Sequence, residues 1–200
     1  ALLTGASRKA MHNNLTGFEF ANGIPGTLGG AVTMNAGAYG GEMKDVVSSV
    51  RAIDVNNNIV EYTNEEMNFR YRSSKVQDDN LIVLGVWIQL KEGNPEEIKE
   101  KMRELAFKRT SKQPLEMPSA GSTFKRPEGY FAAKLIEDAG LKGLIHKGAQ
   151  VSEKHSGFVI NKDNATCKDI LELIEIIKQT VKEKFNVELE REVKIVGEEK

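Results

Sequence analysis

The sequence lacks the features that several common classes of protein need. Cys167 is its single cysteine, so the chain cannot form an internal disulfide. No uninterrupted apolar run approaches the roughly 20 residues of a membrane-spanning helix. The 28 lysines and arginines offset 29 aspartates and glutamates, and a formal net charge of −1 provides no overall positive field for nucleic acid or an anionic membrane. We therefore expect a cytoplasmic protein with no nucleic-acid or membrane partner.

The sequence also has few histidine and cysteine residues that could bind a metal ion or act as a nucleophile. The three histidines, His12, His146 and His155, are not closely spaced with one another or with Cys167. Neither C-x-x-C nor H-E-x-x-H occurs, so no metal site is predicted. Cys167 has no visible histidine partner that would make it a nucleophile, and we expect it to be inert.

Capping signals and apolar spacing predict two long helices. Asn94 precedes a proline and two glutamates, which is typical of a helix start, and helical spacing continues over 95–108. Thr166-x-x-Asp169 resembles a capping box, and apolar residues then recur every three or four positions as far as Phe185.

Strand patterns accompany these helices. The runs 46–55 and 59–62 flank three asparagines, which tolerate a left-handed turn, and 81–90 is a third run rich in β-formers. Apolar and charged residues alternate over 187–195, which predicts a half-buried strand with Glu192 pointing away from the core. The mixture predicts the α+β class.

A domain boundary is predicted where a proline-containing stretch, 110–118, follows the first long helix. The two lobes would be 1–111 and 112–200. The second lobe would hold a short helix, 131–139, ended by Gly140, two strands near 149–151 and 158–161, and then the second long helix and the final strand. Because the chain starts at Ala1 without a signal sequence, we expect it to begin inside a larger protein.

Glycine is concentrated near the start of the chain, where eight of the 18 glycines lie between Gly17 and Gly41. Glycine loses more backbone entropy on folding than other residues, so this density needs a reason. One is close approach of the backbone to a flat or phosphorylated ligand, and the other is a set of tight turns. The spacing matches neither G-x-G-x-x-G nor a P-loop.

Five segments together resemble one enzyme family. IPGTLGGAVTMNAGAYG at 24–40 looks like the second FAD-binding lobe of vanillyl-alcohol-oxidase-type (PCMH-like) flavoproteins. FRYRSS at 69–74, KRTSKQP at 108–114, SAGSTFKRP at 119–127 and LEREVKIVG at 189–197 resemble, in that order, the UDP-N-acetylenolpyruvoylglucosamine reductases of bacterial peptidoglycan synthesis. The family's N-terminal lobe has no counterpart in this sequence.

The resemblance implies an FAD-dependent, NADPH-using oxidoreductase that converts UDP-N-acetylglucosamine enolpyruvate into UDP-N-acetylmuramate. It also implies a second FAD-binding lobe followed by a smaller α+β substrate-binding domain. Two alternatives remain: another flavin oxidoreductase of the same superfamily, or a non-catalytic nucleotide-sugar-binding fragment. The sequence does not define an oligomeric state.

The family's three catalytic positions correspond to Arg72, Ser122 and Glu192. The resemblance implies that Arg72 holds the substrate carboxylate and that Ser122 donates a proton, because hydride addition makes the neighbouring carbon strongly basic. Protonated Glu192 would share the charge developing on that carboxylate. By residue type alone these would be a surface arginine, a turn serine and a solvent-facing glutamate.

The remaining predicted contacts divide between substrate and flavin. Arg126 stands where some family members have asparagine, and both side chains can donate to phosphate oxygens. Arg109 is predicted to reach the flavin or its phosphates, with capping of helix carbonyls as the alternative. The substrate-binding candidates are Tyr71, Lys112, Lys125, Arg126, Lys142 and His155. The flavin-binding candidates are Ile24, Pro25, Gly26, Thr27, Gly29, Gly30, Ala31, Asn35, Gly37, Ala38, Tyr39 and Arg109.

Overall fold

The computed structural model describes residues 1–197, and the chain divides into two compact units. Unit 1 is Ala1–Arg109 and unit 2 begins at Thr110. Helices and sheets occur in both units, and each unit has its own apolar core, which confirms the α+β prediction.

Unit 1 is built on a three-stranded antiparallel sheet in the order β5-β4-β6. β4 (Val47–Ile53) pairs with β5 (Ile59–Thr63) across the predicted asparagine turn, in which Asn57 has φ +64°. β6 (Ile82–Ile88) pairs with the other edge of β4. These three strands confirm the predicted β-rich runs.

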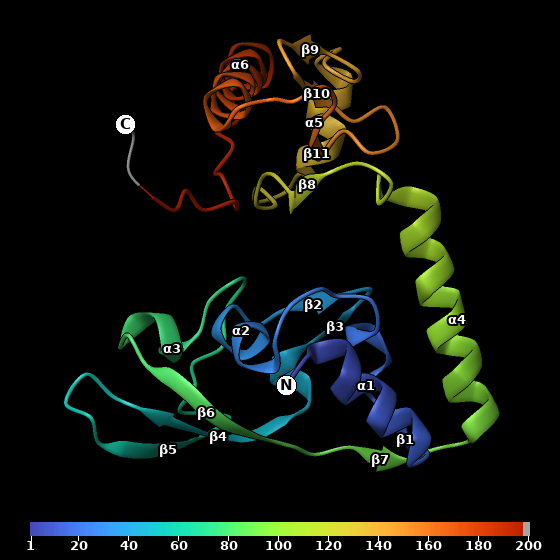
Figure 1. The fold of residues 1–200 in the computed structure, drawn as a ribbon, viewed down its shortest axis with the longest axis vertical. Coiled ribbons are helices and arrows are strands. Elements are labelled where there is room, and N and C mark those ends of the chain that lie inside the picture. The colour runs from blue at the N-terminus through green and yellow to red at the C-terminus, as the bar shows by residue number, and fades with distance from the viewer. Residues whose placement is uncertain (198–200) are drawn as a thin grey trace. The chain divides into compact units, whose positions relative to one another are not determined.

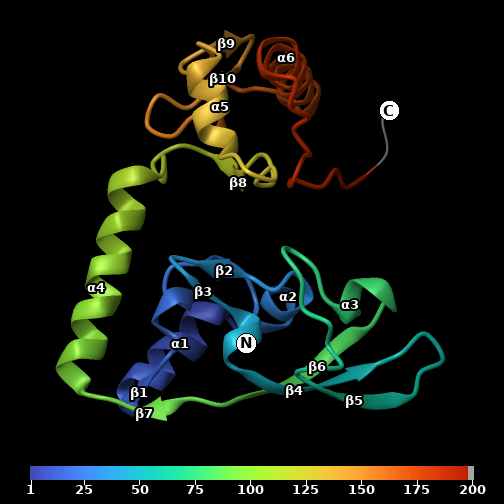
Figure 2. The same ribbon diagram turned by 180° about the vertical axis from the view of Figure 1, so that it is seen from behind.

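Helix α2 (Leu28–Thr33) contacts β6 of this sheet, and α1 (Leu3–His12) packs beside α2 (Figures 1 and 2). Val50 and Ala52 of β4 are fully buried in the core beneath them, together with Val32 of α2. The shorter elements of unit 1 are β1 (Leu15–Thr16), η1 (Glu19–Ala21), β2 (Gly37–Ala38), β3 (Gly41–Glu42), η2 (Met43–Asp45), α3 (Lys75–Asp78) and β7 (Lys91–Glu92).

The long helix α4 (Pro95–Lys112) continues from unit 1 into unit 2 (Figure 1). Asn94 caps it as predicted, because the Asn94 side-chain oxygen accepts a hydrogen bond of 2.9 Å from the Glu96 backbone N–H. The helix extends one turn beyond the predicted end at Lys108. Its buried residues are Ile98, Met102 and Leu105.

The elements of unit 2 are β8 (Ser119–Ser122), α5 (Ala132–Asp138), β9 (Ile145–His146), β10 (Ala149–Val151), β11 (Phe158–Asn161) and α6 (Cys167–Phe185). The four strands form an antiparallel sheet in the order β8-β11-β10-β9. Helix α6 contacts β9, β10 and β11 and packs against α5. The predicted elements near 131–139, 149–151 and 158–161 are all present, and Gly140 ends α5 with φ +79°.

The start of α6 has the predicted capping box. The Thr166 hydroxyl accepts a hydrogen bond from the Asp169 N–H, and the Asp169 carboxylate accepts one of 2.9 Å from the Thr166 N–H. The bonds from Thr166, with a further contribution from Lys147, lower the pKa of Asp169 to about 2.

This pKa shift predicts a pH-dependent contribution to stability. Because the folded state favours the Asp169 carboxylate, its contribution is complete above the ordinary pKa of about 4 and is lost as the pH falls from about 4 to about 2. We expect the denaturant midpoints of the wild type and Asp169→Asn to differ at pH 6 and to converge near pH 2. Asp163→Asn, in the preceding loop, controls for the loss of one charge, and a constant difference at all pH values would contradict the assignment.

The predicted strand at 187–195 is wrong. Among the described residues of this segment, only Arg191 forms a bridge, with Phe124. Leu189 is buried in the core of unit 2, but Ile195 is 51% exposed, so the alternating pattern continues beyond the part that packs. Alternation of apolar and charged residues is typical of a half-buried strand, but it does not show whether a neighbouring strand is present to form backbone hydrogen bonds. Within residues 1–197, none of the helices has the length and apolar character needed to cross a membrane.

Candidate functional site

The glycine-rich segment of unit 1 uses its glycines for two different reasons. A Cβ added at Gly41 would lie 2.6 Å from the Phe20 ring, and one at Gly37 would lie 2.7 Å from the Gly41 carbonyl oxygen. At Gly26, by contrast, φ is +120° and no atom lies within 4 Å of an added Cβ. Tight packing within unit 1 therefore explains Gly37 and Gly41, whereas Gly26 has an unusual backbone conformation beside open space.

Exposure differs among the predicted flavin-binding residues. Ala31 is 5% exposed and contributes to the core, and Asn35 is 1% exposed. Neither residue therefore presents appreciable surface to a ligand in this structure. Tyr39 is 44% exposed and has φ +55°. The other exposed members of the set are Pro25, Gly26, Thr27 and Gly30, and the partly buried ones are Ile24, Gly29, Gly37, Ala38 and Arg109.

Arg109 places a partly buried cation beside this segment. Its side chain is near Gly23, because a Cβ added there would lie 3.3 Å from the Arg109 Nε atom. This Nε atom is buried and has no hydrogen-bond partner among the described residues, so it does not cap a carbonyl. Burial lowers the pKa of the guanidinium, and Tyr39 acts in the opposite direction. A buried donor without a partner suits an anionic group, such as a phosphate of a bound nucleotide cofactor.

Arg72 lies at the tip of a tight turn in unit 1. Arg70 and Ser73 exchange two backbone hydrogen bonds, of 3.0 and 3.2 Å, across the turn. Arg72 has φ +55°, a conformation that costs a residue with a Cβ about 1–2 kcal/mol. Its guanidinium carbon lies 4.8 Å from the centre of the Tyr71 ring, and Tyr71 is 50% exposed. Strain of this kind is retained where the surrounding structure fixes the conformation.

Asn35 ties this turn to the glycine-rich segment. Its side-chain nitrogen donates to the Glu42 carboxylate at 2.7 Å and to the Arg70 carbonyl at 3.2 Å, and its oxygen accepts from the Lys44 N–H at 2.9 Å. Ser74 adds a second tie, since its buried hydroxyl donates to the Thr33 carbonyl at 2.8 Å. The sequence gives no sign of these links, because the paired residues are 35 and 41 positions apart.

Ser122 ends strand β8 of unit 2, where it pairs with Phe158 of β11. The preceding Gly121 has φ +87° with open space around it, and Ser122 is exposed. The next residue, Thr123, is buried, and its hydroxyl accepts a hydrogen bond of 3.0 Å from the Val159 N–H. The serine is therefore accessible at the end of a strand that is held firmly on one side.

Glu192 lies beside the end of strand β8. The Glu192 N–H donates to the Thr123 carbonyl at 2.9 Å, and the Lys125 N–H donates to the Glu190 carbonyl at 2.9 Å. The segment 190–192 thus runs antiparallel to 123–125, next to Ser122. Glu192 is half-buried. Unit 2 therefore brings together two of the three predicted catalytic residues, and unit 1 presents the third.

Three predicted substrate-binding cations, Lys125, Lys142 and Arg126, interact with other residues of unit 2. Lys125 pairs with Glu190, and Lys142 donates to Glu137 at 3.1 Å. Arg126 lies over the Phe131 ring, with its guanidinium carbon 3.9 Å from the ring centre. Lys112, at the end of α4, is exposed. Exposed pairs of this kind contribute little to stability, so an anionic ligand can compete for these cations at small cost.

His155 and Lys125 are the partly buried members of the predicted substrate contacts. The Nδ1 atom of His155 accepts a hydrogen bond of 3.1 Å from the Gly157 N–H, and the His155 ring centre lies 5.0 Å from the Phe158 ring centre. Burial lowers the pKa of His155, and Lys112 and Lys142 act in the same direction, so neutral imidazole is favoured. The neighbouring Ser156 hydroxyl is buried without a hydrogen-bond partner among the described residues, which sequence reasoning did not suggest.

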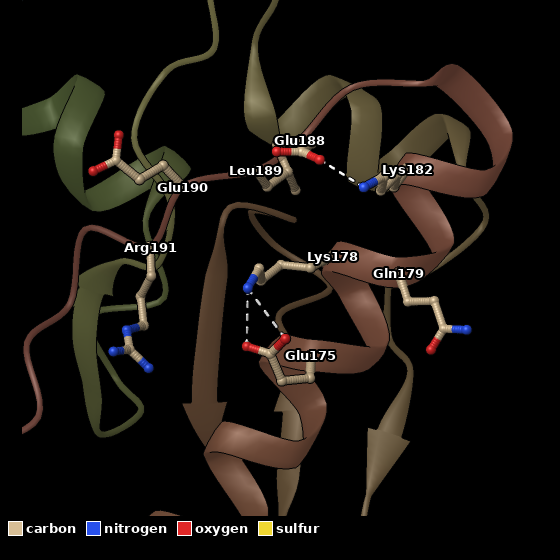
Figure 3. Close-up of a pocket in the computed structure, with 8 residues that line it drawn as sticks. All are labelled: Glu175, Lys178, Gln179, Lys182, Glu188, Leu189, Glu190 and Arg191. Carbon is tan, nitrogen blue, oxygen red and sulfur yellow. Dashed lines mark hydrogen bonds and ion pairs between the residues drawn. The ribbon is translucent and has the colours of Figure 1, made fainter.

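A separate groove on unit 2 runs along α6 (Figure 3). Its charges largely neutralise one another, since Lys178 pairs with Glu175 and Lys182 pairs with Glu188. None of the predicted site residues lines it, and residues 1–197 contain no cluster of acidic, histidine or cysteine side chains that could hold a metal ion. The groove is lined by Glu175, Lys178, Gln179, Lys182, Glu188, Leu189, Glu190 and Arg191.

Comparison with family models divides the chain in a similar way. Residues 3–63 match an FAD binding domain, and residues 113–196 match the C-terminal domain of UDP-N-acetylenolpyruvoylglucosamine reductase. The first match includes the glycine-rich segment, and the second includes Ser122 and Glu192.

Proteins named UDP-N-acetylenolpyruvoylglucosamine reductase are similar to this chain over nearly all of its length. The reductase of Caldanaerobacter subterraneus subsp. tengcongensis is 63% identical over 198 residues, and that of Clostridioides difficile is 58% identical over 199. These matches cover 99% and 100% of this chain but 66% of each relative, so the chain spans just under two thirds of their length. A crystal structure of the reductase from Thermus caldophilus has a TM-score of 0.84 and 39% identity, covering 96% of this chain and 69% of that one.

Proposed function

This chain belongs to the UDP-N-acetylenolpyruvoylglucosamine reductase family, and we propose that it is the part of such an enzyme that binds and reduces the nucleotide-sugar substrate. The reaction is the FAD- and NADPH-dependent conversion of UDP-N-acetylglucosamine enolpyruvate into UDP-N-acetylmuramate. We place it in the cytoplasm, where it supplies a peptidoglycan precursor. The observation that carries the proposal is the backbone pairing that brings Glu192 beside the exposed Ser122.

The residues of unit 1 suit an FAD site. Arg109 offers a buried donor without a partner, and the open backbone at Gly26 permits close approach. When bound, FAD would take a hydride from NADPH and deliver it to the enolpyruvyl double bond. Arg109 would hold a cofactor phosphate, and Tyr39 is exposed and suited to contact the cofactor.

The three proposed catalytic residues divide the rest of the chemistry. Arg72 binds the substrate carboxylate through two hydrogen bonds and stabilises the negative charge that hydride addition sends there. Ser122 gives its hydroxyl proton to the carbon of the enolpyruvyl double bond that lies next to the carbon receiving the hydride. Glu192, in its protonated form, donates a hydrogen bond to the charged carboxylate.

Substrate anchoring is assigned to the cations of unit 2. Lys112, Lys125, Arg126 and Lys142 would bind the diphosphate, while neutral His155 offers a hydrogen bond to the sugar nucleotide. Tyr71 of unit 1 would contact the substrate next to Arg72. With these roles we propose the domain division 1–111 for the FAD-binding lobe and 112–200 for the substrate-binding domain.

The test is a visible absorption spectrum of the purified chain with added FAD, followed by titration with the enolpyruvyl UDP-sugar. We expect a flavin band that remains with the protein after gel filtration and shifts when the sugar nucleotide is added. Binding of the sugar nucleotide without flavin would favour a non-catalytic binding fragment. Binding of neither would contradict the proposal for this chain.

A further inference from the structure

The side chain of Gln77 connects the arginine turn to the end of helix α2. Gln77 belongs to the short helix α3, which directly follows the turn. Its side-chain nitrogen donates to the Thr33 carbonyl at 2.9 Å and to the Arg72 carbonyl at 3.3 Å. The two amide hydrogens therefore hold together two backbone segments that are 39 residues apart in the sequence.

The bond to the Arg72 carbonyl acts on the strained residue itself. Arg72 has φ +55°, and rotation of the peptide group that follows it would swing its carbonyl away from the Gln77 amide. Asn35 and Ser74 hold the two flanks of the turn, through the Arg70 carbonyl and the Thr33 carbonyl. Gln77 therefore resists the relaxation that would move the base of the Arg72 side chain.

We propose that Gln77 is a positioning residue that fixes the Arg72 backbone, and with it the base of the Arg72 side chain, for the reductive step. This inference rests on the proposed function, because it requires Arg72 to contact the substrate carboxylate. Gln77 does not touch the substrate in this proposal and acts only through the Arg72 backbone. What matters is its ability to donate hydrogen bonds, since both of its partners are carbonyl oxygens.

Three substitutions in the full-length enzyme separate donation from size. Gln77→Met keeps the length but removes the donors, Gln77→Glu replaces them with an acceptor, and Gln77→Lys keeps a donor. In rapid-mixing experiments on the FAD-loaded enzyme, we expect the Met and Glu variants to slow flavin reoxidation by saturating substrate by about ten- to a hundredfold. Reduction by NADPH should not change, and Gln77→Lys should recover most of the rate.

Controls distinguish positioning from general destabilisation. Gln179→Met makes the same change on the exposed face of α6, where the Gln179 amide donates to the Glu183 carboxylate at 2.9 Å, and it should leave both half-reactions unchanged. In an Arg72→Lys background, Gln77→Met should have little further effect, because its action requires the native arginine.

Two results would overturn the inference. One is an unchanged reoxidation rate in Gln77→Met when Arg72→Lys alone is slow, which would refute the role of Gln77 and leave the proposed function intact. The other is full additivity of the two substitutions, which would show that Gln77 acts independently of Arg72. If Arg72→Lys alone left the rate unchanged, the proposed function itself would fail.

Discussion

Replacing Ser122 with alanine in the full-length enzyme is expected to slow flavin reoxidation by the substrate by about 10²–10⁴-fold, the usual range for loss of a general acid. Reduction of the flavin by NADPH should proceed at the wild-type rate, because in the proposed role Ser122 supplies its proton only after hydride reaches the substrate. Stopped-flow absorbance of the flavin band measures the two half-reactions separately.

The structure supplies a matched control for this variant. Ser119 lies at the other end of β8, is exposed as Ser122 is, and pairs through its backbone with Ile160. Ser119→Ala should leave both half-reactions unchanged. Ser122→Ala should unfold like the wild type, since β8 is held by backbone hydrogen bonds and by the buried Thr123. An equal loss in both half-reactions would contradict the role of Ser122 as proton donor.

A second large effect is expected at Arg72. Arg72→Lys keeps the positive charge but loses the planar pair of donors, so we expect reoxidation of the flavin by substrate to fall by about 10²–10³-fold. The loss should appear in the rate at saturating substrate as well as in affinity, because the carboxylate gains charge during the reaction. Rapid mixing at several substrate concentrations separates these two effects.

Arg51 provides the corresponding control in unit 1. Like Arg72, it lies over an aromatic ring, with its guanidinium carbon 5.0 Å from the centre of the Trp87 ring, and it forms an exposed ion pair with Glu61. Arg51→Lys should leave both half-reactions unchanged, with little effect on stability. A similar loss of rate in both variants would show that replacing an arginine of unit 1 disturbs the protein in general and would count against a specific role of Arg72.

Much of the secondary structure could be predicted because its causes are local. The cap at Asn94 and the capping box at Thr166 and Asp169 involve residues within three positions of one another. The asparagine turn between β4 and β5 is set by residues that tolerate positive φ. In each case the interaction that defines the element is contained in a few consecutive residues.

The segment 187–195 shows where local patterns fail. Its alternation of apolar and charged residues is real, and Leu189 is buried, but its backbone bridges only at Arg191 among the described residues. A strand requires a partner along its length, and the partner in this case, 123–125, is short and distant in sequence. Periodicity reports which side chains are apolar and does not report which backbone groups are paired.

The candidate site divides in the same way. The identities of Arg72, Ser122, Glu192 and the glycine-rich segment could be taken from the sequence, because the family resemblance is carried by short motifs. The tertiary structure decided which residues support them. The buried side chain of Asn35 connects the glycine-rich segment to the turn that carries Arg72. The side chain of Gln77 connects the same turn to the end of α2.

The sequence by itself determined the α+β class, the caps, the turns and the residue types of the proposed chemistry, because each depends on neighbouring residues or on a contiguous motif. Only the tertiary structure decided that Glu192 lies beside Ser122, 70 residues away in the sequence, and that the strained Arg72 is held by amides from two other segments. The first arrangement depends on backbone hydrogen bonds between distant segments, and the second depends on side-chain amides that donate to backbone carbonyls. In both cases the accepting carbonyl leaves no pattern in the sequence, because every residue offers the same backbone acceptor.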